Sequence, residues 1–271
     1  MPDVIKGKAT ICIANYKTLD LSRLCLRSIR KFTNYPYEVI VVDNGSEDES
    51  LEYLRGLNWI RLMERDSKGD PGGGYSHGAA LDLGLQNCNT EFFISLHSDT
   101  FVQKDNWLTD LIGYFGDDEN IACVGTDKIE LTPRWRTLLK KATDFRTFKH
   151  KLLHRPDPVG KYRHYNRTIC CLYRTQILRR QGLFFLMDRD KGFTTGKKLY
   201  FELIDRGYKT IELPPSKVGQ YLIHLAHATQ AVNPDEFNLR SRTIRKYRRL
   251  VDKVMASSVV KSILQDDSLD C

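Results

Sequence analysis

Short hydrophobic runs alternate with amphipathic stretches along the N-terminal part of the chain. The runs are rich in β-branched and aromatic residues and turn abruptly polar, as buried parallel strands do, and they cover residues 10–14, 38–42, 59–63 and 92–96. The stretches between them are predicted helices at residues 19–32, 49–57 and 76–87. Strands that alternate with helices predict a doubly wound, mostly parallel α/β sheet.

The alternation loosens beyond residue 100. There we predict helices at residues 106–115 and 199–206 and strands at residues 121–124, 168–172 and 209–213. Apolar side chains recur at helical spacing among basic residues at 134–153. The last segment, residues 236–271, is predicted to be a polar helical tail.

Two of the predicted strands end in an acid. Asp43 follows the run at 38–42, and Asp99 stands in the polar cluster after the run at 92–96. Open α/β sheets bind ligands at the edge where parallel strands reach their carboxyl ends. An Asp there can accept a hydrogen bond from a base or ribose, and an Asp in a polar cluster can hold a divalent cation that contacts a diphosphate. The pair predicts a nucleoside-diphosphate site. The alternative is that both acids belong to turns, where they cap a helix or accept hydrogen bonds from backbone amides.

The chain has a formal net charge of +8, and the basic excess lies in its second half. Residues 134–167 contain 11 Lys or Arg against Asp144 and Asp157, and residues 240–253 form a second basic stretch. Such asymmetry indicates an anionic partner or surface. A helix at 134–153 would either be solvated and packed on the domain, which is the commoner case, or lie on an anionic membrane surface.

The composition is that of an ordinary soluble globular protein, with 41% hydrophobic and 28% charged residues. No apolar run approaches the roughly 18 residues of a membrane span, and the N-terminus lacks the apolar stretch of a secretory signal. The seven cysteines include no CxxC pair, so neither a zinc site nor a disulfide framework is expected. We expect a cytoplasmic protein, with peripheral contact to the inner face of the membrane as the further option.

Several short motifs, taken in order, resemble glycosyltransferase family 2. They are Ala14-Asn15-Tyr16, Val41-Val42-Asp43-Asn44-Gly45-Ser46, His77-Gly78-Ala79-Ala80-Leu81-Asp82, Leu96-His97-Ser98-Asp99-Thr100 and Trp107-Leu108. The resemblance covers residues 9–125 well and 168–213 loosely. It implies a GT-A fold with a Rossmann-like nucleotide-sugar-binding half at 1–125, an acceptor-binding half at 126–235 and the helical tail at 236–271.

In that family pattern an acid at the end of the second strand contacts the nucleobase, and the last Asp of an Asp-x-Asp motif holds manganese or magnesium. The resemblance therefore implies a base contact for Asp43 and a ligand to Mn²⁺ or Mg²⁺ at Asp99. His97 stands where the family has the first acid of the motif, and an imidazole can ligate a transition metal or bond a ribose hydroxyl. The donor site that the resemblance implies also includes Ala14, Asn15, Gly74 and Ser98.

Two further histidines are candidates. His77 follows a glycine loop. A contact with the donor phosphate and an ordinary position on a helix surface are equally good interpretations of this residue. In several family members a histidine near the end of the acceptor half completes the metal site, and His227 falls nearer that position than His224. The alternative is a pair of core or surface histidines, because three-residue spacing is weak evidence for a metal site.

The general base departs from the family pattern. Inverting members carry a Glu-Asp pair before a helix that ends in Gly-Tyr, and that Asp deprotonates the acceptor hydroxyl. Counting back from Gly207-Tyr208 reaches Thr195-Gly196 instead. The nearest carboxylates make Asp190 the candidate base, with Asp188 behind it, unless the base is absent.

The resulting hypothesis is a metal-dependent and, by family default, inverting glycosyltransferase of polysaccharide biosynthesis. It would move a sugar from a nucleoside-diphosphate donor to a hydroxyl of a glycan or lipid-linked glycan. The missing Glu-Asp pair supports a rival, a non-catalytic nucleotide-sugar-binding protein. The basic stretches suggest a nucleic-acid-binding protein, but the sequence has no DNA or RNA recognition motif, so no nucleic-acid partner is expected.

Overall fold

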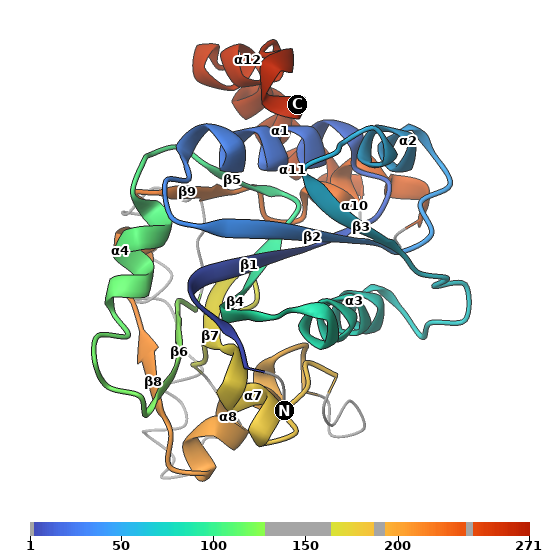
Figure 1. The fold of residues 1–271 in the computed structure, drawn as a ribbon. Coiled ribbons are helices and arrows are strands. Elements are labelled where there is room, and N and C mark those ends of the chain that lie inside the picture. The colour runs from blue at the N-terminus through green and yellow to red at the C-terminus, as the bar shows by residue number, and fades with distance from the viewer. Residues whose placement is uncertain (1–2, 128–163, 187–192, 237–240) are drawn as a thin grey trace, which may run out of the picture.

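The computed structural model describes residues 3–127, 164–186, 193–236 and 241–271. In this part of the chain a central sheet has seven strands in the order β3-β2-β1-β4-β7-β6-β8 (Figure 1). They are β1 (Ile5–Asn15), β2 (Tyr37–Asp43), β3 (Ile60–Glu64), β4 (Thr90–His97), β6 (Ile121–Gly125), β7 (Cys170–Arg174) and β8 (Lys209–Glu212). Only β7 runs antiparallel to its neighbours in this described sheet, which confirms the predicted mostly parallel α/β sheet.

Strands β1, β2 and β4 end at the same edge of the sheet. Their parallel register pairs Asn15 with Asp43 and Ala14 with His97. Each strand is a run of buried residues that stops where the polar side chains begin. The expected meeting of strand ends is therefore present, and the candidate site is built along it.

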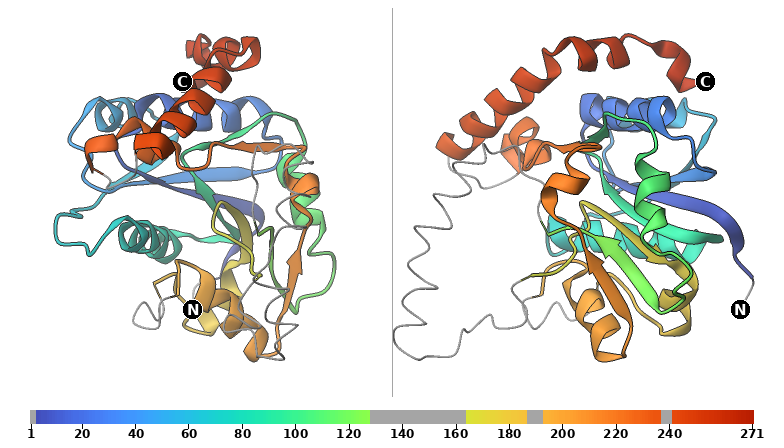
Figure 2. Two further views of the ribbon diagram at one scale, coloured as in Figure 1. Left: turned by 180° about the vertical axis from the view of Figure 1, so that it is seen from behind. Right: turned by 90° about the vertical axis from the view of Figure 1, so that its left-hand side faces the viewer.

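Helices cover both faces of the sheet (Figure 1, Figure 2). On one face lie α1 (Leu19–Phe32) and α2 (Glu49–Arg55), and on the other lie α3 (Gly73–Asn87), α7 (Thr175–Arg180) and α8 (Lys197–Asp205). Successive residues of β1 point to opposite faces of the sheet, and each face has its own hydrophobic core. Ile11 and Ile13 pack in one core and Cys12 packs in the other. A strand buried on both faces has no polar side, which is why it appears in the sequence as a continuous apolar run.

A small second sheet joins two distant parts of the chain. Strand β5 (Thr100–Val102) follows the polar cluster after β4 and pairs antiparallel with β9 (Leu222–His224). Thr100 is the register partner of His224, so the pairing brings that histidine beside Asp99. The sequence analysis predicted neither of these three-residue strands.

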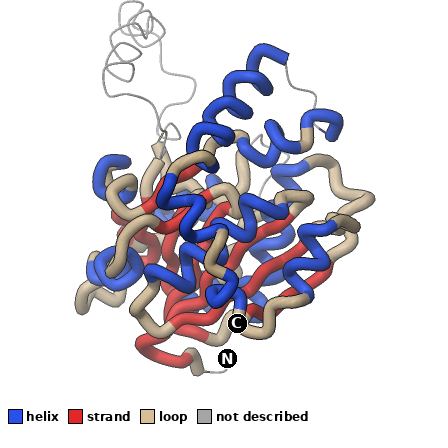
Figure 3. The backbone as a smooth tube through the Cα atoms, turned by 90° about the horizontal axis from the view of Figure 1, so that it is seen from above, coloured by secondary structure: helices blue, strands red, loops and turns tan. Residues whose placement is uncertain are grey.

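The C-terminal helices α11 (Ser241–Met255) and α12 (Ser258–Leu264) arch over α1 (Figure 2). In the view from above, helices lie in front of the strands of the sheet (Figure 3). Arg27 of α1, with a side chain only 3% exposed, donates hydrogen bonds to Asp267 and Asp270. These contacts fix the end of the chain to the first helix. The helices predicted in this segment are thus present. The remaining described helices are α4 (Trp107–Gly113), α9 (Pro215–Val218), α10 (Ala228–Val232), and the 3₁₀ turns η3 (Pro234–Glu236) and η4 (Asp267–Asp270).

Predicted and observed elements differ mainly at their ends. The first helix has the predicted bounds, whereas the strand predicted at 168–172 is found at Cys170–Arg174. The basic stretch 134–153 lies outside the described residues. Among the helices that are described, none combines the length and the apolar character needed to cross a membrane.

Candidate functional site

A cavity of about 1090 Å³ lies at the carboxyl edge of the sheet. The ends of β1 and β4, the first turn of α3 and the segment from 224 to 236 contribute to its wall. The predicted site residues that line it are Ala14, Asn15, Gly74, His77, His97, Ser98, Asp99 and His227. Asp43 is not among the lining residues, although its neighbour Asn44 is.

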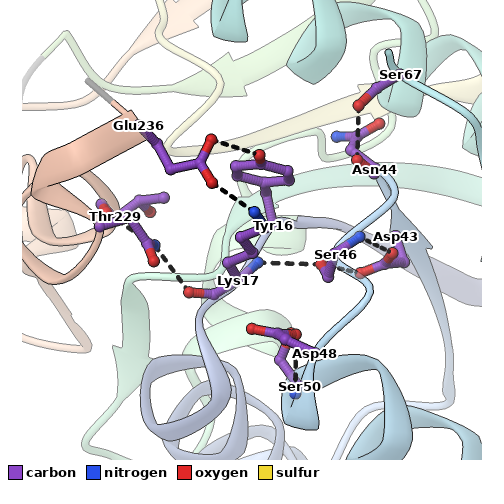
Figure 4. Close-up of polar contacts among 11 residues, drawn as sticks. Tyr16, Lys17, Asp43, Asn44, Ser46, Asp48, Ser50, Ser67, Thr229 and Glu236 are labelled. Carbon is purple, nitrogen blue, oxygen red and sulfur yellow. Dashed lines mark hydrogen bonds and ion pairs between the residues drawn. The ribbon is translucent and has the colours of Figure 1, made fainter. Parts of the chain in front are cut away.

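The Asp43 carboxylate points into the protein and orders the turn after β2. Asp43 is 1% exposed, and its carboxylate accepts hydrogen bonds from Asn15 Nδ2 at 2.7 Å and from the backbone N–H of Ser46 at 2.8 Å. The Ser46 hydroxyl donates to it as well (Figure 4). In this structure Asp43 therefore shapes the strand ends, and the base contact that the family resemblance implies for it stays a prediction.

Asn44 occupies the cavity wall at this strand end. Its Oδ1 is buried and has no hydrogen-bond partner among the described residues. Its backbone carbonyl accepts a hydrogen bond of 2.6 Å from the Ser67 hydroxyl, which holds the residue in place (Figure 4). A buried acceptor that lacks a protein partner is uncommon, and a ligand N–H or hydroxyl group would satisfy it.

Asp99 faces two histidines. Its Oδ1 lies 3.3 Å from Nε2 of His224 and 3.7 Å from Nδ1 of His97. Ligand atoms of the three residues lie within 4.8 Å of one another. Asp99 Oδ1 is buried and has no hydrogen bond of regular geometry among the described residues. Carboxylate oxygen and imidazole nitrogen are both common ligands of divalent metals, so this group fits a cation.

One hydroxyl lies between two imidazoles of the site. Thr168 Oγ1 is 3.4 Å from Nε2 of His97 and 3.2 Å from Nε2 of His77, and the two rings meet edge to face at 4.7 Å. A hydroxyl has one proton to donate, so it donates to one ring and accepts from the other. Because His97 contacts Thr168 through Nε2, its Nδ1 is left on the side of Asp99. Sequence reasoning missed Thr168, which belongs to no motif.

The charge states of these groups suit metal ligation. Burial lowers the pKa of His77 to about 4 and the pKa of His97 well below its usual value, so both rings are neutral near pH 7. Burial by itself raises the pKa of Asp99, but its interactions with His224, with His97 and with the backbone N–H of Ala228 outweigh burial and hold this pKa below its usual range. An ionised carboxylate and neutral imidazoles are the forms that bind a cation.

His227 lies on the cavity wall but outside this group. Its Nδ1 is 2.8 Å from Oε1 of Gln230, and its ring packs 4.7 Å from that of Tyr247. The ligand group found among the described residues contains His224 and not His227. The geometry thus favours the histidine that the sequence analysis ranked second, because the β5–β9 pairing carries His224 to Asp99.

The candidate bases Asp188 and Asp190 lie outside the described residues. Leu186, just before them, lines the cavity. Asp82 of α3 holds this part of the chain, since its carboxylate accepts the backbone N–H groups of Phe185 at 2.7 Å and Leu186 at 3.2 Å. The start of the segment that carries both acids is therefore anchored at the cavity.

The C-terminal part of the chain contacts the cavity through Glu236. The Tyr16 hydroxyl donates a hydrogen bond of 2.9 Å to this carboxylate, and the Lys17 ammonium is paired with it (Figure 4). Both Tyr16 and Glu236 line the cavity. Sequence reasoning missed Glu236 because nothing in its local pattern reveals that its partners stand near the N-terminus.

The chain resembles curated glycosyltransferases over part of its length. It is 29% identical over 111 residues to O-antigen chain rhamnosyltransferase RfbN of Salmonella typhimurium, a match that covers 41% of this chain and 34% of the relative. It is 29% identical over 119 residues to chondroitin synthase of Pasteurella multocida, covering 41% of this chain and 11% of the relative. The match thus spans about a third or less of these relatives.

Solved structures share the fold. Mannosyltransferase PcManGT from Pyrobaculum calidifontis, in complex with GDP-Man and Mn²⁺, matches with a TM-score of 0.54 and 19% identity over 79% of this chain and 57% of that one. S. aureus TarS matches with a TM-score of 0.52 and 16% identity over 89% and 69%. These likenesses confirm the GT-A fold. The sequence profile of glycosyl transferase family 2 matches residues 10–182, more than half of the chain, and the chain belongs to that family.

Proposed function

We propose that this protein is a metal-dependent glycosyltransferase that moves a sugar from a nucleoside-diphosphate donor to an acceptor hydroxyl with inversion. The acceptor would be a glycan or a lipid-linked glycan. The observation that carries the proposal is the position of Asp99, whose buried carboxylate stands beside two histidines on the wall of a large cavity. The family and the location of the cavity at the carboxyl edge of the sheet support it.

The donor would lie along the strand ends from Asn44 to Asp99. The buried Oδ1 of Asn44 would accept a hydrogen bond from the base or ribose. Gly74 and His77 stand in the first turns of the fifteen-residue helix α3. Backbone N–H groups at such a terminus favour a negative charge, so the diphosphate would approach there. Ala14 and Ser98 would line the part of the cavity between the nucleoside and the diphosphate.

His97, Asp99 and His224 would hold the cation. When bound, Mn²⁺ or Mg²⁺ would offset the negative charge that develops on the departing nucleoside diphosphate. The Thr168 hydroxyl would keep the His97 ring oriented, as the outer partners of metal ligands generally do.

Asp190, or Asp188 behind it, would take the proton from the acceptor hydroxyl. A single displacement from the face opposite the leaving group inverts the anomeric centre and needs one such base. Through Phe185 and Leu186, Asp82 would position the start of the segment that carries this acid.

A panel of UDP-, GDP- and TDP-sugars, each with and without Mn²⁺, tests the proposal. At least one donor should raise the melting temperature, because a ligand that binds only the folded state stabilises it by mass action. The same donor should be hydrolysed or transferred by the wild type, and Asp99→Asn should lose this turnover while it keeps the wild-type fold by circular dichroism. A donor that binds tightly but is never turned over would favour the non-catalytic rival.

We further propose a peripheral contact with an anionic membrane surface at the cytoplasmic face. Helix α11 carries exposed basic residues at helical spacing on one stripe, namely Arg242, Arg245, Lys246, Arg249 and Lys253. Cosedimentation should be stronger with phosphatidylcholine vesicles that contain phosphatidylglycerol than with pure phosphatidylcholine, and salt should weaken it. Equal cosedimentation with both vesicles would overturn this contact, and the double variant R245E/R249E should reduce it.

A further inference from the structure

We propose that Arg167 binds an oxyanion of the acceptor, so that the acceptor is a glycan with a phosphate or carboxylate near the hydroxyl that receives the sugar. The inference deepens the proposed function and rests on it, because it names the chemistry of the acceptor in the same cavity. What carries it is a guanidinium on the cavity wall that the protein orients without using all of its hydrogen-bond donors.

The Arg167 side chain is held by an acid and by an aromatic ring. Its Nε donates a hydrogen bond of 2.8 Å to Oδ1 of Asp127, and its guanidinium lies over the Tyr165 ring, 4.8 Å from the centroid. Tyr165 is 4% exposed, and its hydroxyl is 2.6 Å from Oγ1 of Thr194, so the ring itself is fixed. A guanidinium that is already oriented loses little freedom when it binds a ligand.

The two terminal amino groups of Arg167 have no hydrogen-bond or ion-pair partner among the described residues. The side chain is 31% exposed, and Arg167 is the only lysine or arginine among the described residues that line the cavity. Two amino groups in one plane match two oxygens of a carboxylate or a phosphate. Such charged, bidentate pairs are stronger than hydrogen bonds between neutral groups.

The order of strands at this edge of the sheet separates Arg167 from the donor. Asn44 follows β2 and Asp99 follows β4, whereas Arg167 precedes β7 and its partner Asp127 follows β6. The strands lie in the order β2-β1-β4-β7-β6 (Figure 1). A donor with its nucleoside at Asn44 and its diphosphate near Asp99 would reach only as far as β4.

Arg167 therefore lies beyond the diphosphate, on the side away from the nucleoside. Strands β7 and β6 are the first and second strands past β4, roughly 5 and 10 Å from it. The backbone N–H of Arg167 donates a hydrogen bond of 2.9 Å to the Thr126 carbonyl, which joins this residue to the end of β6. The transferred sugar and the acceptor would occupy this part of the cavity.

The charge around Arg167 also favours an anion. Nζ of Lys197 lies 5.5 Å from the centroid of the same Tyr165 ring, so a second cation stands nearby. The segment 193–197 contains no acid. Positive charge that is not fully offset by acids attracts an anionic ligand. Arg167 ends the basic stretch 134–167, so an anionic acceptor would account for this part of the positive charge seen in the sequence.

The test is a titration of the full chain, without nucleotide, followed by saturation-transfer NMR. The probes are methyl glucuronide and glycerol 3-phosphate, and methyl glucoside and glycerol are their neutral counterparts. We expect at least one anionic probe to bind about fivefold or more tightly than its counterpart. The probe with the larger preference distinguishes a carboxylate from a phosphate. If neither anionic probe binds more tightly than its counterpart, the proposal is overturned.

Variants assign this preference to one side chain. Arg167→Gln removes the charge and both amino groups and should abolish the preference, and a preference that persists would overturn the proposal. Arg55→Gln is the matched control and should leave the preference unchanged. Arg55 also donates its Nε to a carboxylate, that of Glu64 at 2.8 Å, but it does not line the cavity.

A second variant keeps Arg167 and tests the proposal even if Arg167→Gln fails to fold. Asp127→Asn retains an oxygen that can accept from Nε and removes a negative charge that competes with the ligand. It should therefore bind the preferred anionic probe as tightly as the wild type or more tightly. Weaker binding in Asp127→Asn would overturn the proposal.

Calorimetry with UDP and GDP in the presence of Mn²⁺ distinguishes an acceptor group from a donor group. Arg167→Gln should leave the affinity for either diphosphate nearly unchanged, because the diphosphate would lie at β4. A loss as large as that seen with the anionic probes would assign Arg167 to the donor and overturn the proposal.

Failure of this inference differs from failure of the proposed function. If the anionic probes bind through Arg167 and no donor is ever turned over, the anion site stands and the transferase function falls. If Arg167→Gln glycosylates a neutral glycan as fast as the wild type does, and neither anionic probe is preferred, the function stands and the anion site falls.

Discussion

The Tyr16 hydroxyl donates a hydrogen bond of 2.9 Å to Glu236 and so joins the end of β1 to the C-terminal part of the chain. Lys17 pairs with the same carboxylate, and the Asn233 amide donates to the Lys17 carbonyl at 2.8 Å. All of these contacts lie at or beside the cavity. They hold the 224–236 wall against the strand that would carry the donor.

We predict that Glu236→Ala weakens nucleoside-diphosphate binding about threefold to tenfold, because the wall loses the two contacts that Glu236 makes with Tyr16 and Lys17. The melting temperature should change little, since the Lys17 and Glu236 side chains are partly exposed and water screens their charges. Calorimetry with the diphosphate of the best donor measures the first effect. Tyr16→Phe removes one contact only and should give an intermediate loss, and wild-type affinity in Glu236→Ala would contradict the prediction.

Substitutions at the adjacent residues Asp43 and Asn44 should affect different properties: the stability of the fold at Asp43 and nucleotide binding at Asn44. Asp43→Ala removes the shortest hydrogen bond of the buried Asn15 amide and the side-chain acceptor of the Ser46 backbone N–H, and should lower the free energy of unfolding by about 2–4 kcal/mol. Asn44→Ala removes an acceptor that has no partner among the described residues and should change this free energy much less. It should instead weaken nucleotide binding about fivefold. Chemical denaturation and nucleotide titration of both variants would show whether the two effects separate.

Much of the fold follows from local pattern, and so does the place of the site. The periodicity of residues 19–32 gives the bounds of α1, and the apolar runs give β1, β2 and β4 to within a few residues. Because parallel strands end together, the polar residues that follow them were expected to meet. The structure brings Asn15, His97 and Asp99 to one cavity wall.

The parts that could not be predicted depend on non-local contacts or on the choice between adjacent polar residues. A three-residue strand has no measurable period, so the pairing of Thr100 with His224 left no trace in the sequence. Asp43 and Asn44 are both polar and follow the same strand. Only the hydrogen bonds of Asn15 and Ser46 decide which of them turns inward.

Gly84 of α3 provides a test of how closely this helix packs on β1. A Cβ atom at Gly84 would lie 2.3 Å from Cys12 Sγ in the core of the sheet. We predict that Gly84→Ala lowers the free energy of unfolding by about 1–3 kcal/mol, because a buried sulfur and a helix backbone must move apart. Thermal and chemical denaturation measure the loss.

Two controls separate crowding from helix propensity. Gly74 lies in the first turn of the same helix, and a Cβ atom added there would meet no described atom within 4 Å, so Gly74→Ala should be neutral or slightly stabilising. Cys12→Ala opens space at the contact, and Gly84→Ala should be less damaging in that background. An unchanged loss in the double variant would rule out the steric explanation.

Asp82 should make stability depend on pH in a definite direction. Its residue is 8% exposed, and burial raises the pKa of Asp82 to about 6 even though Phe185 and Leu186 donate to it. An unfolded Asp has a pKa of about 3.9. Between these values the folded state binds more protons than the unfolded state, so stability is lost as the pH rises from about 4 to about 6. The loss from this group amounts to about 3 kcal/mol.

Asp82→Asn removes this proton equilibrium and gives the test. The variant loses one of two hydrogen bonds to the backbone, a penalty that should vary little with pH. Relative to the wild type, the variant should therefore gain about 3 kcal/mol in unfolding free energy between pH 4 and pH 7. Urea denaturation at several pH values measures it. A constant difference would mean that the pKa of Asp82 is the same in the folded and unfolded states, and that the hydrogen bonds of residues 185 and 186 cancel the effect of its burial.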